Sequence, residues 1–277
     1  MYCALLWCQE RIFLEEWSLS KDLLMAHGQV ADSSPDYYDL PLNINNKGIL
    51  YEEALFEKLK EVSVVPRGFK PAGSDSLAPD LKFIWLGKVY NLEVKLDKKA
   101  DYGQSGLRYV NNAWQLDGSS ASAHVSMRQM LHDMGITKFV NSREGWGGLG
   151  QPRKYLVESH GINTTWADKE SDYGTFLDKY ISIPNDTVTR YYNSKGIYYI
   201  HIGKLGTFYM GSDPANMARA TEMAEFDADL KLRIRKKGSS SNPNYRFSLA
   251  LLLANIPLAS RFDISDDASI QHLTGNR

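Results

Sequence analysis

The sequence has few cysteines, no long apolar run and no excess of charge of either sign. Only two of its 277 residues are cysteines, Cys3 and Cys8, too few for a tetrahedral zinc site. No segment reaches the ~20 apolar residues that a membrane-spanning helix needs, and Glu10 and Arg11 interrupt the N-terminus before a signal peptide could form. We therefore expect reduced thiols and a soluble protein of the cytoplasm or another intracellular compartment, with no membrane partner.

The sequence also has no large net charge and no phosphate-binding loop motif. The 32 basic and 33 acidic residues give a net charge of −1, so any surface for a polyanion must be a local patch. The glycine-rich segment 145–150 lacks the GxxxxGK[ST] pattern of a nucleotide phosphate loop, and no haem or flavin motif is present in the sequence. With 43% apolar residues, the composition suits one large globular domain or a core with an extra module.

A candidate β-hairpin occupies residues 77–97. Two runs rich in aromatic and branched apolar residues, 81–86 and 89–96, are separated by Gly87, which suits a two-residue turn. This pattern predicts two paired strands with one polar cluster at their open end.

The turn determines which polar residues face each other. A turn at residues 86–87 places Asp80 opposite Glu93, and a turn at residues 87–88 places Asp80 opposite Lys95. In both registers the three side chains share one face, because side chains alternate along a strand.

Two carboxylates so close together repel each other unless a cation lies between them. One interpretation is that Asp80, Glu93 and the carbonyl of Val94 bind Mg²⁺, which prefers oxygen ligands. Lys95 would then position or deprotonate the attacking water, or offset charge on a phosphate. The alternative is an exposed strand with an ordinary surface ion pair, but the apolar residues around the cluster favour a buried strand.

The order Pro79-Asp80, twelve residues, then Glu93-Val94-Lys95 resembles the PD-(D/E)XK nuclease superfamily. The resemblance covers roughly residues 45 to 110 and depends on a short motif. It implies an α/β fold, with a restriction-endonuclease-like or Holliday-junction-resolvase-like mixed sheet flanked by helices. It further implies Mg²⁺ or Mn²⁺ as cofactor, Asp80 and Glu93 as metal ligands, and Lys95 as the catalytic lysine.

Two further site residues follow from the same resemblance. Relatives often place a glutamate from the first core helix at the metal, and the helix expected at 49–62 offers Glu53 or Glu52. We prefer Glu53, which borders the expected apolar stripe of that helix, Leu50, Ala54, Leu55 and Leu59. Several relatives also carry a glutamine after the motif strand that contacts the substrate or a water molecule, and Gln104 is the candidate.

We expect three parts along the chain: an N-terminal helical segment 1–44, a nuclease core 45–165, and a β-rich C-terminal region 166–277, either separate or part of the same domain. After the hairpin, the periodicities predict helices at 119–134, 172–181 and 213–226, a hairpin at 196–211, and strands at 230–237 and 245–253. The polar tail after Arg261 is expected to fray.

Basic residues are concentrated beside the motif and on the predicted strand at 230–237, LKLRIRKK. Apolar and basic residues alternate in this strand, so its cations share one face. The candidate phosphate-binding residues are Lys98, Lys99, Arg108, Lys231, Arg233, Arg235, Lys236 and Lys237. A solubilising face on an edge strand explains the same pattern without a ligand.

The sequence therefore predicts a metal-dependent nuclease that hydrolyses phosphodiester bonds in DNA. Two alternatives stay open: an RNA endonuclease with the same core, and a catalytically inactive nucleic-acid-binding protein of the same fold. A homodimer is a further expectation if both strands of a duplex are cut.

Overall fold

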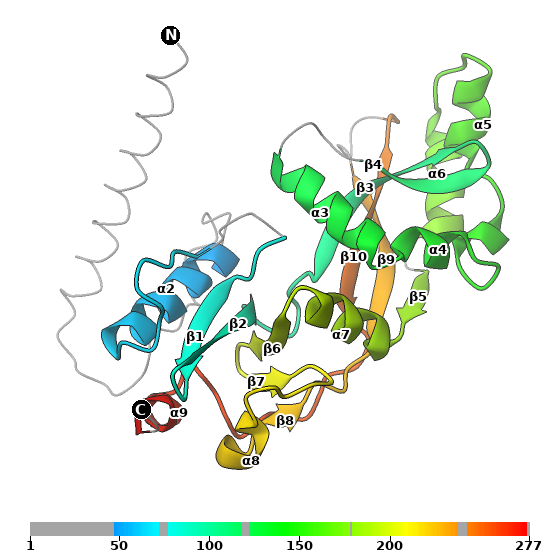
Figure 1. The fold of residues 1–277 in the computed structure, drawn as a ribbon. Helices are drawn as coiled ribbons and strands as arrows, with labels where there is room; N and C mark the ends of the chain where they lie inside the picture. The colour runs from blue at the N-terminus through cyan, green and yellow to red at the C-terminus, as the bar shows by residue number, and fades with distance from the viewer. Residues whose placement is uncertain (1–46, 72–76, 118–121, 178, 238–242, 276–277) are drawn as a thin grey trace, which may run out of the picture. The chain divides into compact units, whose positions relative to one another are not determined.

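The structure is a computed structural model that describes residues 47–71, 77–117, 122–177, 179–237 and 243–275. The predicted helical segment 1–44, with both cysteines, lies outside the described residues. The chain divides into two units, and all described residues belong to the second, Leu40–Arg277. The described part is mixed α/β, with two five-stranded sheets and eight α-helices (Figure 1). None of its helices is long and apolar enough to cross a membrane.

The first sheet contains the predicted hairpin, with strands in the order β1-β2-β6-β7-β8. The β1–β2 and β6–β7 pairs are antiparallel, whereas β2–β6 and β7–β8 are parallel, so the sheet is mixed. Its strands are β1 Leu81–Trp85, β2 Lys88–Lys95, β6 Ile197–Ile202, β7 Gly206–Tyr209 and β8 Ala224–Glu225.

The β1–β2 turn adopts the first of the two expected registers. Leu86 and Gly87 both lie in the left-handed region, with φ values of 48° and 71°, as a tight two-residue turn requires. Trp85 therefore pairs with Lys88, and Asp80, the residue before β1, is in line with Glu93.

Helix α2, Lys47–Glu61, packs against β1 and β2 and confirms the predicted helix. Its buried residues are Tyr51, Leu55 and Leu59, so the buried stripe is rotated from the predicted one. Leu50 and Ala54 are only half-buried. The aromatic Tyr51 contributes more apolar area than either of them, which determines the side that turns to the sheet.

The second sheet is antiparallel throughout, with strands in the order β4-β3-β10-β9-β5. Its strands are β3 Gly103–Val110, β4 Ala113–Asp117, β5 Tyr180–Ile183, β9 Leu230–Lys237 and β10 Arg246–Leu253. Both sheets join strands from either side of residue 165, so the expected core and C-terminal region are interleaved. One hydrophobic cluster contains Ile200 and Phe208 of the first sheet and Leu232 and Leu249 of the second.

Helices α3, Ser122–Asp133, and α4, Ile136–Asn141, pack on β3 and β4. Trp114 of β4 is buried, and its ring centroid lies 5.3 Å from that of Phe176 and 5.4 Å from that of Phe247. Helix α3 confirms the predicted helix over the residues that the structure describes.

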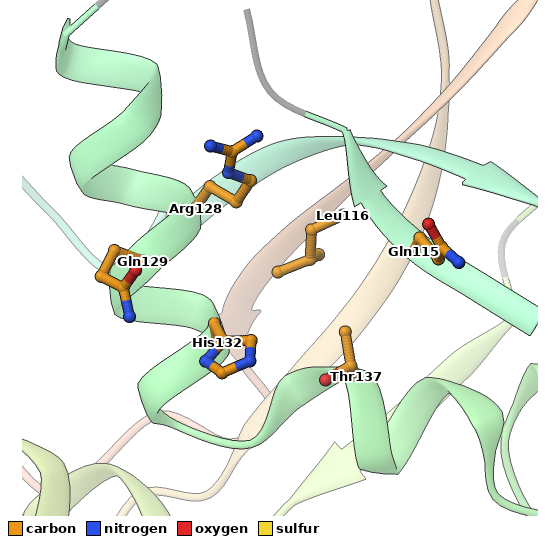
Figure 2. A pocket seen from close by; sticks show the side chains of 6 residues that line it. All are labelled: Gln115, Leu116, Arg128, Gln129, His132 and Thr137. Atoms are coloured by element: carbon orange, nitrogen blue, oxygen red, sulfur yellow. The ribbon is translucent and has the colours of Figure 1, made fainter.

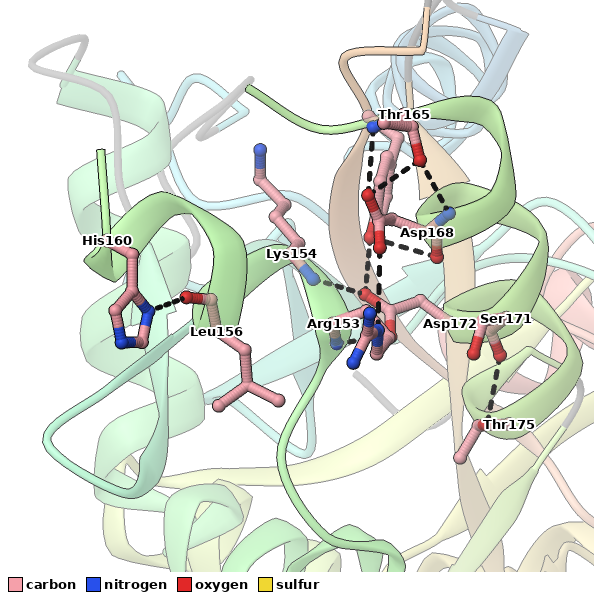
Figure 3. Close-up of polar contacts among 10 residues, drawn as sticks. Arg153, Lys154, Leu156, His160, Thr165, Asp168, Ser171, Asp172 and Thr175 are labelled. Atoms are coloured by element: carbon pink, nitrogen blue, oxygen red, sulfur yellow. Dashed lines mark hydrogen bonds and ion pairs between the residues drawn. The ribbon is translucent and has the colours of Figure 1, made fainter. Parts of the chain in front are cut away.

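Helices α5, Arg153–Ser159, and α6, Trp166–Phe176, are joined by buried carboxylates (Figure 3). The Asp172 carboxylate accepts hydrogen bonds from the backbone N–H groups of Arg153, at 2.6 Å, and Lys154, at 3.0 Å, and from the Tyr245 hydroxyl. Thr165 and Asp168 form a capping box at the start of α6. These bonds fix both helices to β10 through Tyr245.

Several predicted elements differ from those observed. The helix expected at 172–181 is α6, which ends at Phe176 and is followed by β5. The helix expected at 213–226 is reduced to α8, Met217–Thr221, followed by β8; the Asp213 carboxylate accepts the N–H groups of Met217 and Ala218 and caps this short turn. The glycine-rich loop contains the 3₁₀ helix η2, Trp146–Leu149.

The segment after Arg261 is ordered, contrary to the expected frayed tail. Phe262 and Ile264 are buried, and Thr207 of β7 donates its N–H to the carbonyl of Phe262 at 2.7 Å. Lys58 of α2 pairs with Asp267 at 2.6 Å, at the start of α9, Asp267–Gly275. Ile270 and Leu273 of α9 are also buried, and these four apolar side chains dock the segment as a strap over β7 and α2.

Candidate active site

The residues of the motif converge at the end of β2. Lys95 Nζ lies 2.7 Å from Glu93 Oε1, and the two side chains are only 15% and 9% exposed. Asp80 Oδ2 accepts the backbone N–H of Val94 at 2.7 Å. The N–H and C=O of one strand residue point to the same neighbour, so the Val94 carbonyl faces the side on which Asp80 lies. The hairpin therefore brings together all four groups predicted from the motif.

Helix α2 adds Glu52 to this cluster rather than the preferred Glu53. At about 100° per residue, Glu52 lies about 60° from the centre of the buried stripe and Glu53 about 160°. The charges of Lys95 and Glu93 act on Glu52, whereas burial alone raises the pKa of Glu53. The rotation of the stripe, produced by Tyr51, explains the difference, and Glu52 replaces Glu53 in our proposal.

Two tyrosines complete the surroundings of Glu93 and Lys95, and sequence reasoning missed both. Tyr192 of helix α7, Asn185–Ser194, donates its hydroxyl to Glu93 Oε1 at 3.0 Å. Lys95 Nζ lies 5.6 Å from the centroid of the Tyr102 ring. Burial raises the pKa of both phenols, so both remain protonated near neutral pH. No helix was predicted at residues 185–194, so the sequence offered no local signal for Tyr192.

The cluster has more acidic than basic groups. Three carboxyl groups, Glu52, Asp80 and Glu93, surround one ammonium group, that of Lys95. Burial, reinforced by Glu93, raises the pKa of Glu52 to about 7 despite the opposing effect of Lys95. Burial and Glu93 also raise the pKa of Asp80 well above its usual range. Burial lowers the pKa of Lys95, but Glu93 and Asp80 raise it by more, so Lys95 stays charged.

The donor set fits a hard divalent cation. All candidate ligands are oxygens, as Mg²⁺ and Mn²⁺ prefer, and the buried Glu52 Oε2 has no hydrogen-bond partner among the described residues. A dication would balance the two negative charges left when three carboxylates face one ammonium. Within the described ranges, however, no three His, Cys, Asp or Glu side chains form a ready-made metal site. Metal binding would therefore have to draw Asp80, Glu93 and Glu52 closer together.

A buried histidine holds α2, and with it Glu52, against the sheet. His201 pairs with Val94 across the β2–β6 ladder, and its Nε2 lies 2.5 Å from the Tyr51 hydroxyl. Burial lowers the pKa of His201 to about 4, with Asp263 opposing, so the ring is neutral. Its Nδ1 lies 3.1 Å from Thr207 Oγ1. With the proton on Nδ1, the Tyr51 hydroxyl donates to Nε2.

Replacing Tyr51 by phenylalanine is expected to lower the free energy of unfolding by about 1 kcal/mol. The ring stacked on His201 is kept, but the buried Nε2 loses its partner. Urea denaturation measures the change, with Tyr180→Phe as the control because Tyr180 is 51% exposed. Equal losses in the two variants would contradict this role of the hydroxyl.

The remaining predicted residues lie elsewhere. Gln104 is exposed on β3 of the second sheet, where it pairs with Ala250. Lys98 and Lys99 are exposed in the turn after β2. Arg108 is exposed on β3. The other candidates belong to β9, where Lys231 and Arg233 are half-buried and the side chains of Arg235, Lys236 and Lys237 lie outside the described part.

A pocket of about 240 Å³ lies between β4, α3 and α4, apart from the carboxylate cluster (Figure 2). Arg128 and His132 face it from α3. No carboxylate is among the described residues that line it. Its lining residues are Gln115, Leu116, Arg128, Gln129, His132 and Thr137.

No protein-family model, no curated protein and no solved structure matches this chain. The geometry of the carboxylate cluster is therefore the basis on which a function is assigned.

Proposed function

We propose that the chain is a metal-dependent nuclease that hydrolyses phosphodiester bonds in DNA at the cluster of Glu52, Asp80, Glu93 and Lys95. One observation carries the proposal: three carboxyl groups face a single lysine in a largely buried setting, and one carboxylate oxygen has no hydrogen-bond partner within the described part of the chain. Buried ion pairs that have only a structural role usually contain equal numbers of acidic and basic groups, because an unpaired buried charge is costly. An unbalanced acidic cluster is typical of a site that binds a cation.

The protein's own groups have separable roles. Asp80, Glu93, Glu52 and the Val94 carbonyl would hold Mg²⁺ or Mn²⁺, which when bound supplies Lewis-acid stabilisation of charge on the phosphate. Lys95 keeps its positive charge and stabilises the negative charge that develops in the transition state. Tyr192 and Lys95 fix the orientation of Glu93 through its Oε1 atom.

The arrangement of the elements around the motif supports the proposed relation to PD-(D/E)XK nucleases. The motif lies on a hairpin in a mixed sheet, with α2 packed against it and α7 leading into the neighbouring parallel strand β6. The order of the elements around the motif supports the family proposal. Strands β3, β4 and β5 of the second sheet lie in the sequence between the hairpin and α7, and its strands β9 and β10 follow β8.

The test is incubation of the purified chain with linear duplex DNA, single-stranded DNA, branched DNA and RNA, in Mg²⁺, Mn²⁺ or EDTA. We expect cleavage of DNA only when a divalent cation is present, because the carboxylates alone provide no Lewis acid to stabilise charge on the phosphate. Asp80→Asn protein, purified in parallel, controls for contaminating nuclease. Preferential cleavage of RNA would favour the RNA endonuclease, and binding without product in every metal would favour the inactive protein.

A further inference from the structure

We propose that the outer face of the second sheet binds the phosphate backbone of the nucleic acid, at a distance from the carboxylate cluster. This inference rests on the proposed function for the identity of its partner. The surface is built by β3, β9 and β10; we call it the basic face and define it by Arg108, Lys231, Arg233 and Arg246.

The two faces of this sheet differ in chemistry. Leu107, Leu232 and Leu249 point to the core and are buried. Their neighbours along the strands point the other way, and there Arg108 and Arg246 are exposed while Lys231 and Arg233 are half-buried. The strand β9 pairs with β10 and β5, so from Leu230 to Arg233 it is an interior strand and not an edge strand.

The register brings these cations together although they are far apart in the sequence. Ala250 of β10 pairs with Gln104 on one side and with Arg233 on the other. Because Phe247 pairs with Leu107, Arg246 falls beside Arg108. The centre of the face is formed by small residues, with Ser248 paired to Gly106. Basic side chains therefore lie toward both ends of the face, with small residues between them.

The charge of this face is mainly positive. Arg108 Nε lies 3.9 Å from the half-exposed Asp117 carboxylate, a separation too long for a strong ion pair. Lys231 Nζ lies 4.7 Å from the centroid of the Tyr180 ring, which is itself exposed. Four cations on one face of a chain with net charge −1 are a local concentration.

A phosphate backbone matches this surface better than an acidic protein surface does. Strands lie ~4.8 Å apart and alternate residues ~6.6 Å apart, so Arg108 and Arg246 form one pair of cations, and Lys231 and Arg233 form a second pair on the order of 13 Å further along the strands. Phosphates repeat regularly along a nucleic acid, and arginine binds their oxygens in a bidentate manner. The exposed Tyr180 ring beside Lys231 is suited to stacking on a base.

The test compares the wild type with the triple variant Arg108→Gln, Lys231→Gln, Arg246→Gln. Binding of a fluorescein-labelled DNA duplex is followed by anisotropy in EDTA over a range of KCl concentrations. We expect the variant to bind at least about tenfold more weakly, with a salt slope smaller by about 0.9 for each phosphate that is no longer neutralised. The control is Lys60→Gln, Lys138→Gln, Arg190→Gln, which removes the same charge from exposed positions on helices α2, α4 and α7.

A second readout separates this proposal from the nuclease proposal. Hydrolysis of bis(p-nitrophenyl) phosphate needs only the carboxylate cluster, so the triple variant should hydrolyse it at the wild-type rate. Weaker duplex binding with no hydrolysis by either protein would support the basic face and contradict the nuclease. Normal hydrolysis with equal duplex binding and equal salt slopes in both triple variants would overturn the basic face alone.

Discussion

Replacing Lys95 by methionine is expected to lower the rate of DNA cleavage by at least about a hundredfold in Mg²⁺. Methionine keeps most of the apolar stem but removes the ammonium group that lies among Glu52, Asp80 and Glu93. The variant then has no ammonium group in the cluster to stabilise the negative charge that develops on the phosphate. The rate is measured under single-turnover conditions, so that product release does not limit it.

The matched control for Lys95→Met is Lys88→Met, at the other end of β2, where the side chain is exposed. This variant should cleave at nearly the wild-type rate. Circular dichroism in Mg²⁺ establishes that both variants are folded. If Lys95→Met were folded and cleaved DNA within a few-fold of the wild type, the lysine would have no catalytic role and the assignment of the site would be wrong.

In the metal-free protein, Glu52 is expected to make stability fall by about 3 kcal/mol between about pH 4.5 and pH 7. The folded-state pKa is raised, so in this window the folded protein keeps a proton on Glu52 that the unfolded chain releases. The unfolded state binds fewer protons, and the free energy of unfolding decreases as pH rises. The loss is complete above the folded-state pKa of about 7.

The measurement is urea denaturation of the wild type and Glu52→Gln at a series of pH values in EDTA. The difference in stability between the two proteins should shift in favour of Glu52→Gln as pH rises. Above pH 7, Mg²⁺ should stabilise the wild type more than the variant, because it binds the ionised carboxylates of the folded state. Glu57→Gln, at an exposed position of the same helix, is the control. A difference that stays constant with pH would show that Glu52 titrates normally.

The local part of the site was predictable from the sequence. Alternating apolar residues and a glycine at the turn limit the β1–β2 pairing to two registers, and both place Asp80, Glu93 and Lys95 on one face. The structure adopts the register in which Trp85 pairs with Lys88. Glu52 was harder to predict. The apolar spacing alone suggested a stripe through Leu50 and Ala54, whereas the buried stripe of α2 is rotated toward Tyr51, next to Glu52. Tyr192 was out of reach, because it contacts Glu93 across 99 residues through a parallel strand pair that no local signal specifies.

Translation proceeds from the N-terminus, so the parts of the site are synthesised at different times. The motif is complete at Lys95, but its partner strand β6 begins only at Ile197 and the strap that holds Lys58 of α2 extends to Asp267. The three carboxyl groups of the cluster are therefore synthesised well before β6, which pairs with β2, and before Tyr192, which donates a hydrogen bond to Glu93. If the chain is the nuclease that we propose, the surroundings of Glu93 are complete only after α7 and β6 have been synthesised.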